Sequence, residues 1–209
     1  MNIAILLYDR FTALDAIGPY EVLSRLPGAD LTFVAAEPGP VTTDNGMLTL
    51  MATCSIDALP RPDIVLVPGG PGEVAARAGG GVLEWLRAAH ETSTWTTSVC
   101  TGSLILAAAG LLDGVRATSH WLALEKLGEM GAEPVAERVV FDGKIVTAAG
   151  VSAGIDMALT LAARVAGEEV AQAIQLGIEY DPQPPFDAGS PATAPAAIVA
   201  AARTRSRFS

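Results

Sequence analysis

Short runs of β-branched and other apolar residues alternate along this chain with longer segments of helical periodicity, and this alternation constrains the fold most. Five runs are expected to form strands, at residues 2–8, 31–37, 63–69, 94–99 and 144–150. The middle runs are almost wholly apolar, as strands covered by helices on both faces must be. The pattern therefore predicts an α/β fold, with a parallel sheet between layers of helices.

Helices are expected between these strands. In the segment 14–26 the apolar residues fall on one stripe, although Pro19 requires the helix to start near it or to kink there. Trp85 and Leu86 mark a second helix. Two more follow residue 150, and Gly167 stands between them in the position of a C-cap.

Asn-Gly and Asp-Gly dipeptides predict two hairpins, within residues 42–53 and 138–148.

A chain of 209 residues that is 50% hydrophobic can bury one substantial core. We therefore predict a single domain over residues 1–190. The segment 191–209, rich in Ala, Pro and Arg, is expected to form a C-terminal arm or short helix with a frayed end.

The charge balance bears on the class of ligand. A net charge of −10 argues against binding to nucleic acid or to an anionic membrane, because both require clustered Lys and Arg. A small-molecule substrate fits better.

The N-terminal apolar run is short and has no basic leader, so a cytoplasmic location is expected. Two cysteines without CxxC spacing and two histidines predict neither a disulfide framework nor a bound metal.

Cys100 stands at the predicted change from strand to helix in TTSVCTGSLILAAAGLLDG. A residue at such a tight turn has a strained backbone that projects its side chain from the carboxyl edge of the sheet, and the small residues Ser98 and Gly102 let the turn close. The N-terminus of the following helix favours a thiolate. Cys100 is therefore a candidate nucleophile, the alternative being a buried cysteine that packs as a small apolar residue, which is how we interpret Cys54.

Two loops could supply the rest of a catalytic site. The glycine-rich VPGGPG follows a strand, and we predict that the amides of Gly70 and Thr101 form an oxyanion hole, unless the loop is merely a turn. Asp15 lies between apolar residues where the first strand leads into a helix. It is either a helix cap or an acid whose pKa is raised by burial and by a nearby thiolate.

The segments FTALDAIGPYEVL, VLVPGGPG, SVCTGSLILAAAGLLDGVRATSHW and GVSAGIDMALTLAARVAG resemble, in this order, the DJ-1/PfpI superfamily. The similarity is to the branch that contains isocyanide (isonitrile) hydratases and the glutamine-amidotransferase-like domains of some AraC-type regulators. The resemblance implies a flavodoxin-like α/β sandwich and a homodimer. It also implies Cys100 as the nucleophile and Asp15 as its carboxyl partner, where many other members have Glu.

Thr101 matches the threonine that follows the cysteine in isocyanide hydratases, whereas PfpI-type proteases have a histidine there, so no protease Cys-His pair carries over. His120, in ATSHW, is interpreted as a structural residue or a residue at the edge of the pocket rather than as a general base. Tyr180 either lines the pocket or serves only in packing.

The expected function is hydration of an isocyanide to an N-formamide without a metal or organic cofactor. Cys100 attacks the terminal carbon, Asp15 delivers a proton, and a water held by Asp15 or Thr101 releases the product. One alternative is a ligand-sensing module related to the regulators, whose DNA-binding region of about a hundred residues has no counterpart in the short tail ARTRSRFS. The other is a glyoxalase or deglycase-like enzyme.

Overall fold

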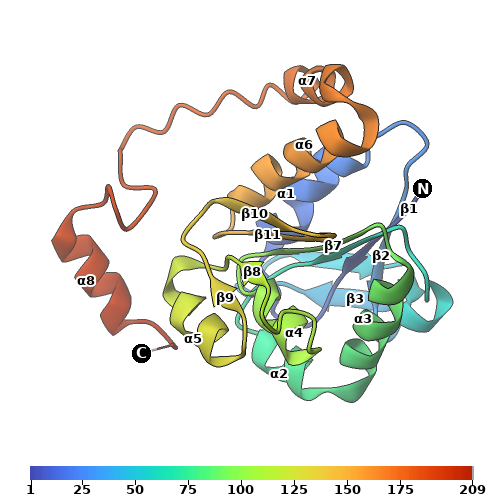
Figure 1. The fold of residues 1–209 in the computed structure, drawn as a ribbon, viewed down its shortest axis with the longest axis horizontal. Helices are drawn as coiled ribbons and strands as arrows, with labels where there is room; N and C mark the ends of the chain where they lie inside the picture. The colour runs from blue at the N-terminus through green and yellow to red at the C-terminus, as the bar shows by residue number, and fades with distance from the viewer. Residues whose placement is uncertain (209) are drawn as a thin grey trace.

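A computed structural model describes residues 1–208 and shows one twisted sheet with helices on both faces (Figure 1). In the described chain this sheet has seven strands in the order β10-β11-β7-β6-β1-β2-β5. All neighbouring pairs are parallel except β10 and β11, which are antiparallel. The strands are β1 (Asn2–Leu6), β2 (Asp30–Ala35), β5 (Cys54–Ser55), β6 (Ile64–Val67), β7 (Trp95–Val99), β10 (Val139–Asp142) and β11 (Ile145–Ala148).

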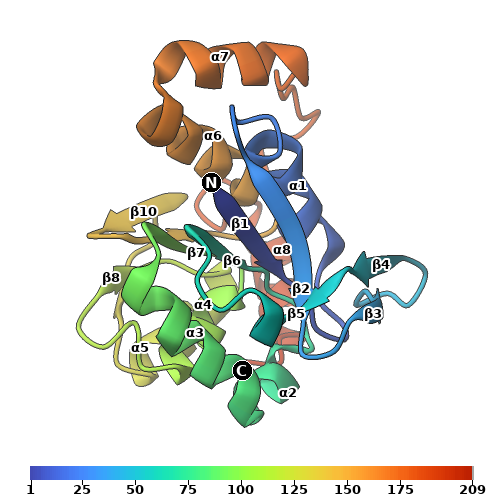
Figure 2. The same ribbon diagram turned by 90° about the vertical axis from the view of Figure 1, so that its right-hand side faces the viewer.

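Alternating side chains of each central strand pack into two separate cores. In β1, Ile3 and Ile5 face one core, and Ala4 and Leu6 face the other. The first core lies beneath α1 (Ala13–Leu23) and α6 (Ala153–Ala166), with α7 (Glu168–Gly177) outside them, and the second beneath α3 (Gly80–Thr92) and α4 (Gly102–Ala108) (Figure 2). This two-sided burial explains the continuous apolar runs and confirms the predicted α/β sandwich.

All five predicted strands are present, and both predicted hairpins form. Four of the strands end two residues earlier than expected, whereas β7 ends as expected and begins one residue later. The first hairpin pairs β3 (Gly39–Thr42) with β4 (Thr49–Ala52) outside the main sheet. Helix α1 continues through Pro19 rather than starting there. Gly167 ends α6 with a φ of 92°, as expected of a C-cap glycine.

Several short elements were not predicted, because each has too few residues to show a period. They are α2 (Glu73–Ala78), α5 (Leu124–Glu129), the two-residue strands β5, β8 (Arg116–Ala117) and β9 (Glu133–Pro134), and the 3-10 helices Ile56–Ala58 and Trp121–Ala123.

The order of the strands determines where a ligand can bind. β1 leads to β2 on one side, and the chain then returns to place β6 and β7 on the other side of β1. The order in which strands are added to the sheet thus reverses between β1 and β6, and open α/β sheets bind ligands at the carboxyl ends of the strands beside such a switch point. Asp15, Gly70 and Cys100 all follow the carboxyl ends of these strands.

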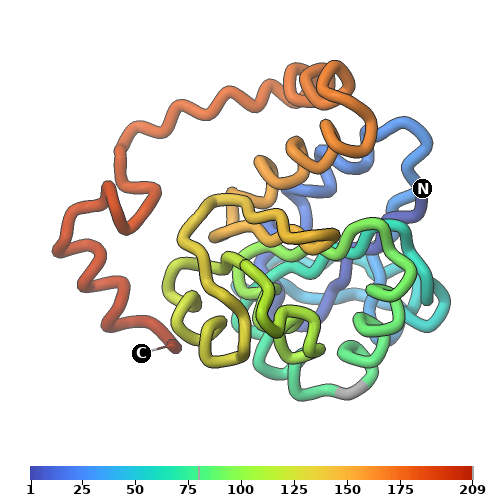
Figure 3. The backbone as a smooth tube through the Cα atoms, viewed as in Figure 1, coloured from blue at the N-terminus to red at the C-terminus, as the bar shows by residue number. Residues whose placement is uncertain are grey.

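The C-terminal part leaves the compact body after α7. Residues 181–193 are exposed and run as an extended arm to α8 (Ala196–Thr204), a short helix with no buried residue (Figure 3). Beyond α8 the chain turns back toward the body, and Arg207 reaches the carboxyl edge of the sheet. Within residues 1–208 no helix is long and apolar enough to cross a bilayer.

Candidate active site

Cys100 occupies a tight elbow between β7 and α4, as predicted. Its φ of 58° lies in the left-handed region, which is strained for a residue with a side chain. Four hydrogen bonds hold this backbone. The Cys100 N–H donates to the carbonyls of Ala148 (3.0 Å) and Ala149 (2.9 Å), and its carbonyl accepts from the hydroxyls of Ser119 (3.0 Å) and Ser103 (3.2 Å). The strain is therefore maintained by the surrounding strands and loops.

Gly102 lets the elbow pack directly on the neighbouring strand. A Cβ at this position would lie 2.1 Å from the carbonyl oxygen of Val67, a distance that backbone atoms cannot accommodate without moving. The same is true of Gly69, where a Cβ would lie 2.5 Å from the Thr101 nitrogen and 2.9 Å from the Asp15 carboxylate. The two glycines bring the β6 loop, the elbow and Asp15 into contact.

Asp15 is fully buried in the first turn of α1 and does not cap that helix. Its Oδ2 accepts a 2.8 Å hydrogen bond from the Gly69 N–H, and its carboxyl group hydrogen-bonds with Cys100. The other oxygen, Oδ1, has no hydrogen-bond partner among the described residues. The capping interpretation of Asp15 is thus wrong, and the structure places this acid beside the thiol.

Burial changes the proton affinities of both groups. It raises the pKa of Asp15 to about 7, with a smaller contribution from the charge of Asp44. The pKa of Cys100 is raised to about 12, first by burial and then by the negative charge of Asp15, although the amides of Val151 and Thr101 hydrogen-bond to the sulfur and oppose this. The expectation of a resting thiolate was therefore wrong, because desolvation outweighs the helix N-terminus, and near neutral pH the pair holds one or two protons.

Of the two amides predicted to form the oxyanion hole, that of Thr101 is directed at the sulfur and that of Gly70 is not. The Gly70 N–H donates to Thr101 Oγ1 at 3.0 Å, so this amide is already engaged. The second amide directed at the sulfur, beside that of Thr101, comes from Val151. Val151 has a φ of 20° and lies directly after the predicted strand 144–150, a position at the carboxyl edge that could have indicated it.

His120 lies at the edge of the cavity, where we expected it. Its Nδ1 accepts a 3.3 Å hydrogen bond from the Leu122 N–H, so the neutral ring carries its proton on Nε2. Burial, and then the charge of Arg207, lower its pKa. A ring in this state has no free lone pair with which to act as a base.

Tyr180 is not brought to the site. It is half-buried at the end of α7, where it hydrogen-bonds with Asp156 and Arg138, and it is absent from the residues that line the cavity at Cys100. The prediction that it lines the pocket was wrong, because the arm turns away from the carboxyl edge at this point.

Cys100 opens into a cavity of about 350 Å³. Its walls include the apolar side chains of Pro71, Leu122, Val151 and Phe208, so an apolar substituent would be stabilised there. A larger cavity of about 610 Å³, beneath the arm, shares His120 and Val151 with it.

The donor set gives no indication of a metal site. Both cysteines are free thiols, and the described part of the chain contains no group of three His, Cys, Asp or Glu side chains that could hold a metal ion. The groups gathered at the carboxyl edge are a nucleophile, an acid, a hydroxyl and backbone amides, which together suit addition to an electrophilic carbon.

Sequence reasoning missed four contributors to the site. The Gly69 and Val151 amides act through the backbone, which leaves no pattern in side-chain type. Ser119 was overlooked beside His120 in ATSHW. Arg207 lies in the C-terminal segment whose end was expected to be frayed, and nothing local in the sequence indicates its contact with Gly70 and Thr101.

A strained cysteine elbow at the switch point of a flavodoxin-like sheet defines a class of α/β proteins, and comparison with known families agrees. The model of the DJ-1/PfpI family matches residues 1–164, and the chain belongs to this family. Isonitrile hydratase of Pseudomonas putida is 45% identical over 205 residues, which cover 98% of this chain and 90% of that protein. The crystal structure of a ThiJ/PfpI family protein from Pseudomonas syringae has a TM-score of 0.94 at 40% identity, covering 97% of this chain and 84% of the other.

Regulators are also related. The HTH-type transcriptional regulator CdhR of Pseudomonas aeruginosa is 33% identical over 163 residues, which cover 76% of this chain but 48% of the regulator. The relatives of this chain thus include a protein named as an enzyme and one named as a regulator.

Proposed function

We propose that this protein hydrates isocyanides, R–N≡C, to N-substituted formamides. The observation that carries the proposal is the buried pair of Cys100 and Asp15, a nucleophile and an acid in direct hydrogen-bond contact at an apolar cavity. The similarity to isonitrile hydratase of P. putida over nearly the whole chain supports this reaction. The substrate is a small molecule whose R group occupies the cavity.

In the first step Cys100 forms a carbon–sulfur bond with the terminal carbon of the isocyanide. The thiol proton passes to the Asp15 carboxylate, and from there to the same carbon, which gives a thioimidate, Cys–S–CH=N–R. Because the pKa of Asp15 is raised to about 7, its carboxylate can accept this proton and its acid can return it near neutral pH.

In the second step a water attacks the thioimidate carbon. Thr101 orients the water through its hydroxyl, and Asp15 takes a proton from the water and returns it to the nitrogen. The carbon–sulfur bond then breaks, and the proton of the new hydroxyl group passes to the sulfur as the carbonyl forms. The products are R–NH–CHO and the Cys100 thiol. Cys100, Asp15 and water carry every proton in this scheme, so the proposed reaction needs no metal or organic cofactor.

We also propose that the protein is a cytoplasmic homodimer. Large apolar side chains of the C-terminal part are exposed in the single chain, among them Leu176, Phe186 and Ile198. Such side chains suit a contact with a second copy. Size-exclusion chromatography with light scattering would report the mass, and a monomer across the micromolar range would contradict this part.

The principal alternative is a ligand-sensing module, which the similarity to CdhR favours. A sensing module needs the cavity but no acid in contact with the thiol, whereas Asp15 is held against Cys100. A glyoxalase-like reaction is the other alternative, since the glutathione-independent glyoxalase DJR-1.2 of Caenorhabditis elegans is 26% identical over 107 residues, about half of this chain.

One assay separates these functions. Purified protein is incubated with an aryl isocyanide, and formamide is measured, alongside a second reaction with methylglyoxal in which lactate is measured. We expect formamide from the wild type and from Cys54→Ala, and at least about a 1,000-fold lower rate from Cys100→Ala, because this variant loses the thiol that forms the covalent bond to the carbon. Lactate without formamide would indicate a glyoxalase, and neither product would favour the sensing module.

A further inference from the structure

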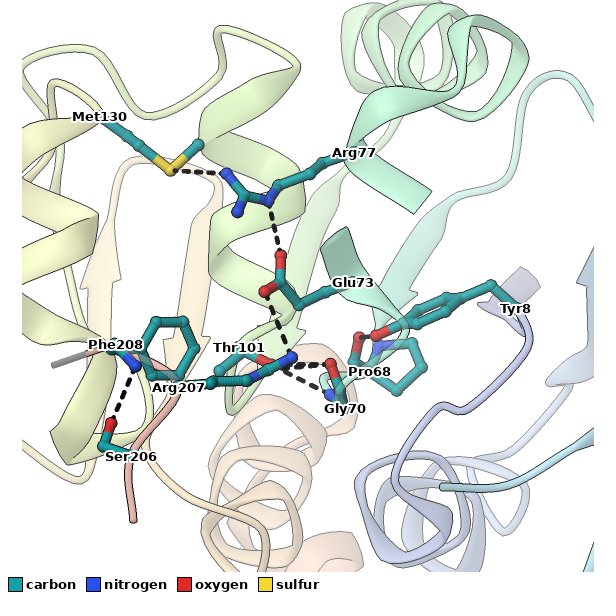
Figure 4. Close-up of polar contacts among 10 residues, drawn as sticks. All are labelled: Tyr8, Pro68, Gly70, Glu73, Arg77, Thr101, Met130, Ser206, Arg207 and Phe208. Carbon is teal, nitrogen blue, oxygen red and sulfur yellow. Dashed lines mark hydrogen bonds and ion pairs between the residues drawn. The ribbon is translucent and has the colours of Figure 1, made fainter. Parts of the chain in front are cut away.

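The C-terminal segment after α8 closes one side of the cysteine cavity. Arg205, Ser206, Arg207 and Phe208 line it together with Cys100, although the arm that precedes them lies away from the body. Figure 4 shows the side chain of Arg207 extended between Glu73 and the Gly70–Thr101 pair. A residue from the far end of the chain thus enters the shell around the nucleophile.

The position of Arg207 is stabilised by a buried carboxylate, that of Glu73. Glu73, in the first turn of α2, is fully buried, and its Oε2 pairs with Arg77 Nε at 2.8 Å. Its Oε1 lies 3.5 Å from Arg207 Nη1. Because a buried carboxylate is stabilised by each cation near it, Glu73 anchors the guanidinium of Arg207 at this position.

The other nitrogen of the guanidinium contacts the site itself. Arg207 Nη2 donates to the Gly70 carbonyl at 3.1 Å and, more weakly, to Thr101 Oγ1 at 3.4 Å. Gly70 in turn donates its N–H to the same Thr101 oxygen at 3.0 Å. Both lone pairs of this hydroxyl therefore face donors.

A hydroxyl whose lone pairs face two donors must use its proton elsewhere. Among the described residues, the acceptor found for Thr101 is the Gly70 carbonyl at 3.5 Å, and Arg207 binds that carbonyl more closely. The 3.5 Å contact from the Thr101 hydroxyl to this carbonyl is long for a hydrogen bond, so the hydroxyl proton can turn from it into the cavity. Thr101 immediately follows Cys100, so this proton can reach a group attached to the sulfur or the water that attacks it.

We propose that Arg207 is a positioning residue for the hydration reaction: it fixes the Thr101 hydroxyl as a hydrogen-bond donor toward the reacting group at Cys100. This inference rests on the function proposed above. Arg207 acts through Thr101 and the Gly70 carbonyl, and its guanidinium exchanges no proton with the substrate.

The test is a double-mutant cycle with formamide production as the readout. Arg207→Ala and Thr101→Val are each expected to lower kcat about 10- to 100-fold, the effect of losing one hydrogen bond strengthened by charge, with KM changed less than about threefold. The double variant should be no slower than Thr101→Val, because Arg207 acts through that hydroxyl. If the loss of kcat in the double variant equalled the product of the losses in the two single variants, the proposal would be overturned.

Rescue distinguishes positioning from a structural role. Guanidinium or ethylguanidinium ion, at concentrations well below those that unfold the protein, should restore at least about a third of the lost activity to Arg207→Ala and none to the double variant. Arg207→Lys retains the charge opposite Glu73 and serves if the alanine variant is unstable. The Tm of Arg207→Lys should be close to that of the wild type, but its kcat should remain low, because a point charge does not reproduce the guanidinium contacts.

Arg25→Ala provides the matched control, since it removes an exposed arginine that pairs with Glu21 on α1. It should retain wild-type kcat. An active wild type together with an equally active Arg207→Ala would overturn this inference alone. A wild type without hydratase activity would overturn the proposed function and this inference with it.

Discussion

Asp15 and Cys100 share a hydrogen bond in a buried site, although one lies in the first turn of α1 and the other follows the strand β7. The Gly69 N–H holds Asp15 in this position through its 2.8 Å bond to Oδ2. The pair therefore behaves as one titrating unit, in which loss of the first proton is governed by Asp15 and loss of the second by Cys100.

The pH dependence of turnover should report this unit. The proposed reaction requires one proton on the pair, and the pKa of Asp15 is raised to about 7 while that of Cys100 is raised to about 12. We expect kcat/KM for an aryl isocyanide to rise with pH through a midpoint near 7 and then to level off. Asp15→Asn should lose at least about 1,000-fold, because it can neither accept nor return the proton.

Asp44 provides a control for this midpoint. Its negative charge contributes to the raised pKa of Asp15, and its Oδ2 accepts from Thr12 Oγ1 at 2.7 Å, a bond that an amide oxygen can also accept. Asp44→Asn should keep the plateau of kcat/KM and move the midpoint to lower pH. A profile that is flat from pH 5 to 9 in the wild type would contradict the role of Asp15.

The free energy of unfolding should change with pH in the opposite direction to turnover, falling as the pH rises from about 4 to about 7. Because the folded pKa of Asp15 lies above its unfolded value of 3.8, the folded state retains a proton that the unfolded state has lost. The resulting cost is absent below about pH 4 and complete above about pH 7, where it reaches at most about 4 kcal/mol. Urea unfolding at pH 4.5 and 7.5 should show Asp15→Asn gaining stability relative to the wild type at the higher pH. An unchanged difference would contradict the buried acid.

Alkylation of the thiol tests the high pKa of Cys100 without a substrate. In a Cys54→Ala background, the rate of reaction with iodoacetamide should rise about tenfold for each pH unit between 7 and 9, since only the thiolate reacts. Adding Asp15→Asn should speed the reaction at each pH, because it removes the charge that raises the pKa of Cys100. A plateau below pH 9 would show that the thiol ionises far more readily.

Gly102→Ala should destabilise the protein by about 3 kcal/mol or more, because the new Cβ would lie 2.1 Å from the Val67 carbonyl oxygen and push the elbow away from β6. Differential scanning calorimetry would measure the change in Tm. Gly81→Ala is the matched control, since the added Cβ meets nothing within 4 Å in helix α3. It should be neutral or stabilising, and equal Tm values for the two variants would contradict this account of the elbow.

The sequence by itself determined the layered fold and one member, Cys100, of the proposed catalytic pair. The apolar runs and the helical periods were enough for the sheet and for the elbow, because both depend on local spacing and on residue size. The resemblance to DJ-1/PfpI proteins connected Asp15 with Cys100, which lie in segments that no local rule joins.

Tertiary structure decided the protonation states of Asp15 and Cys100 and which other groups lie around them. The burial that raises both pKa values comes from the packing of separate segments, so the helix N-terminus seen in the sequence predicted the wrong resting state for Cys100. The engagement of Gly70, the amide of Val151, the displacement of Tyr180 and the return of Arg207 depend on which loops the strand order brings to one edge. Contacts between residues so distant along the chain are set by the fold as a whole, and a linear pattern does not contain them.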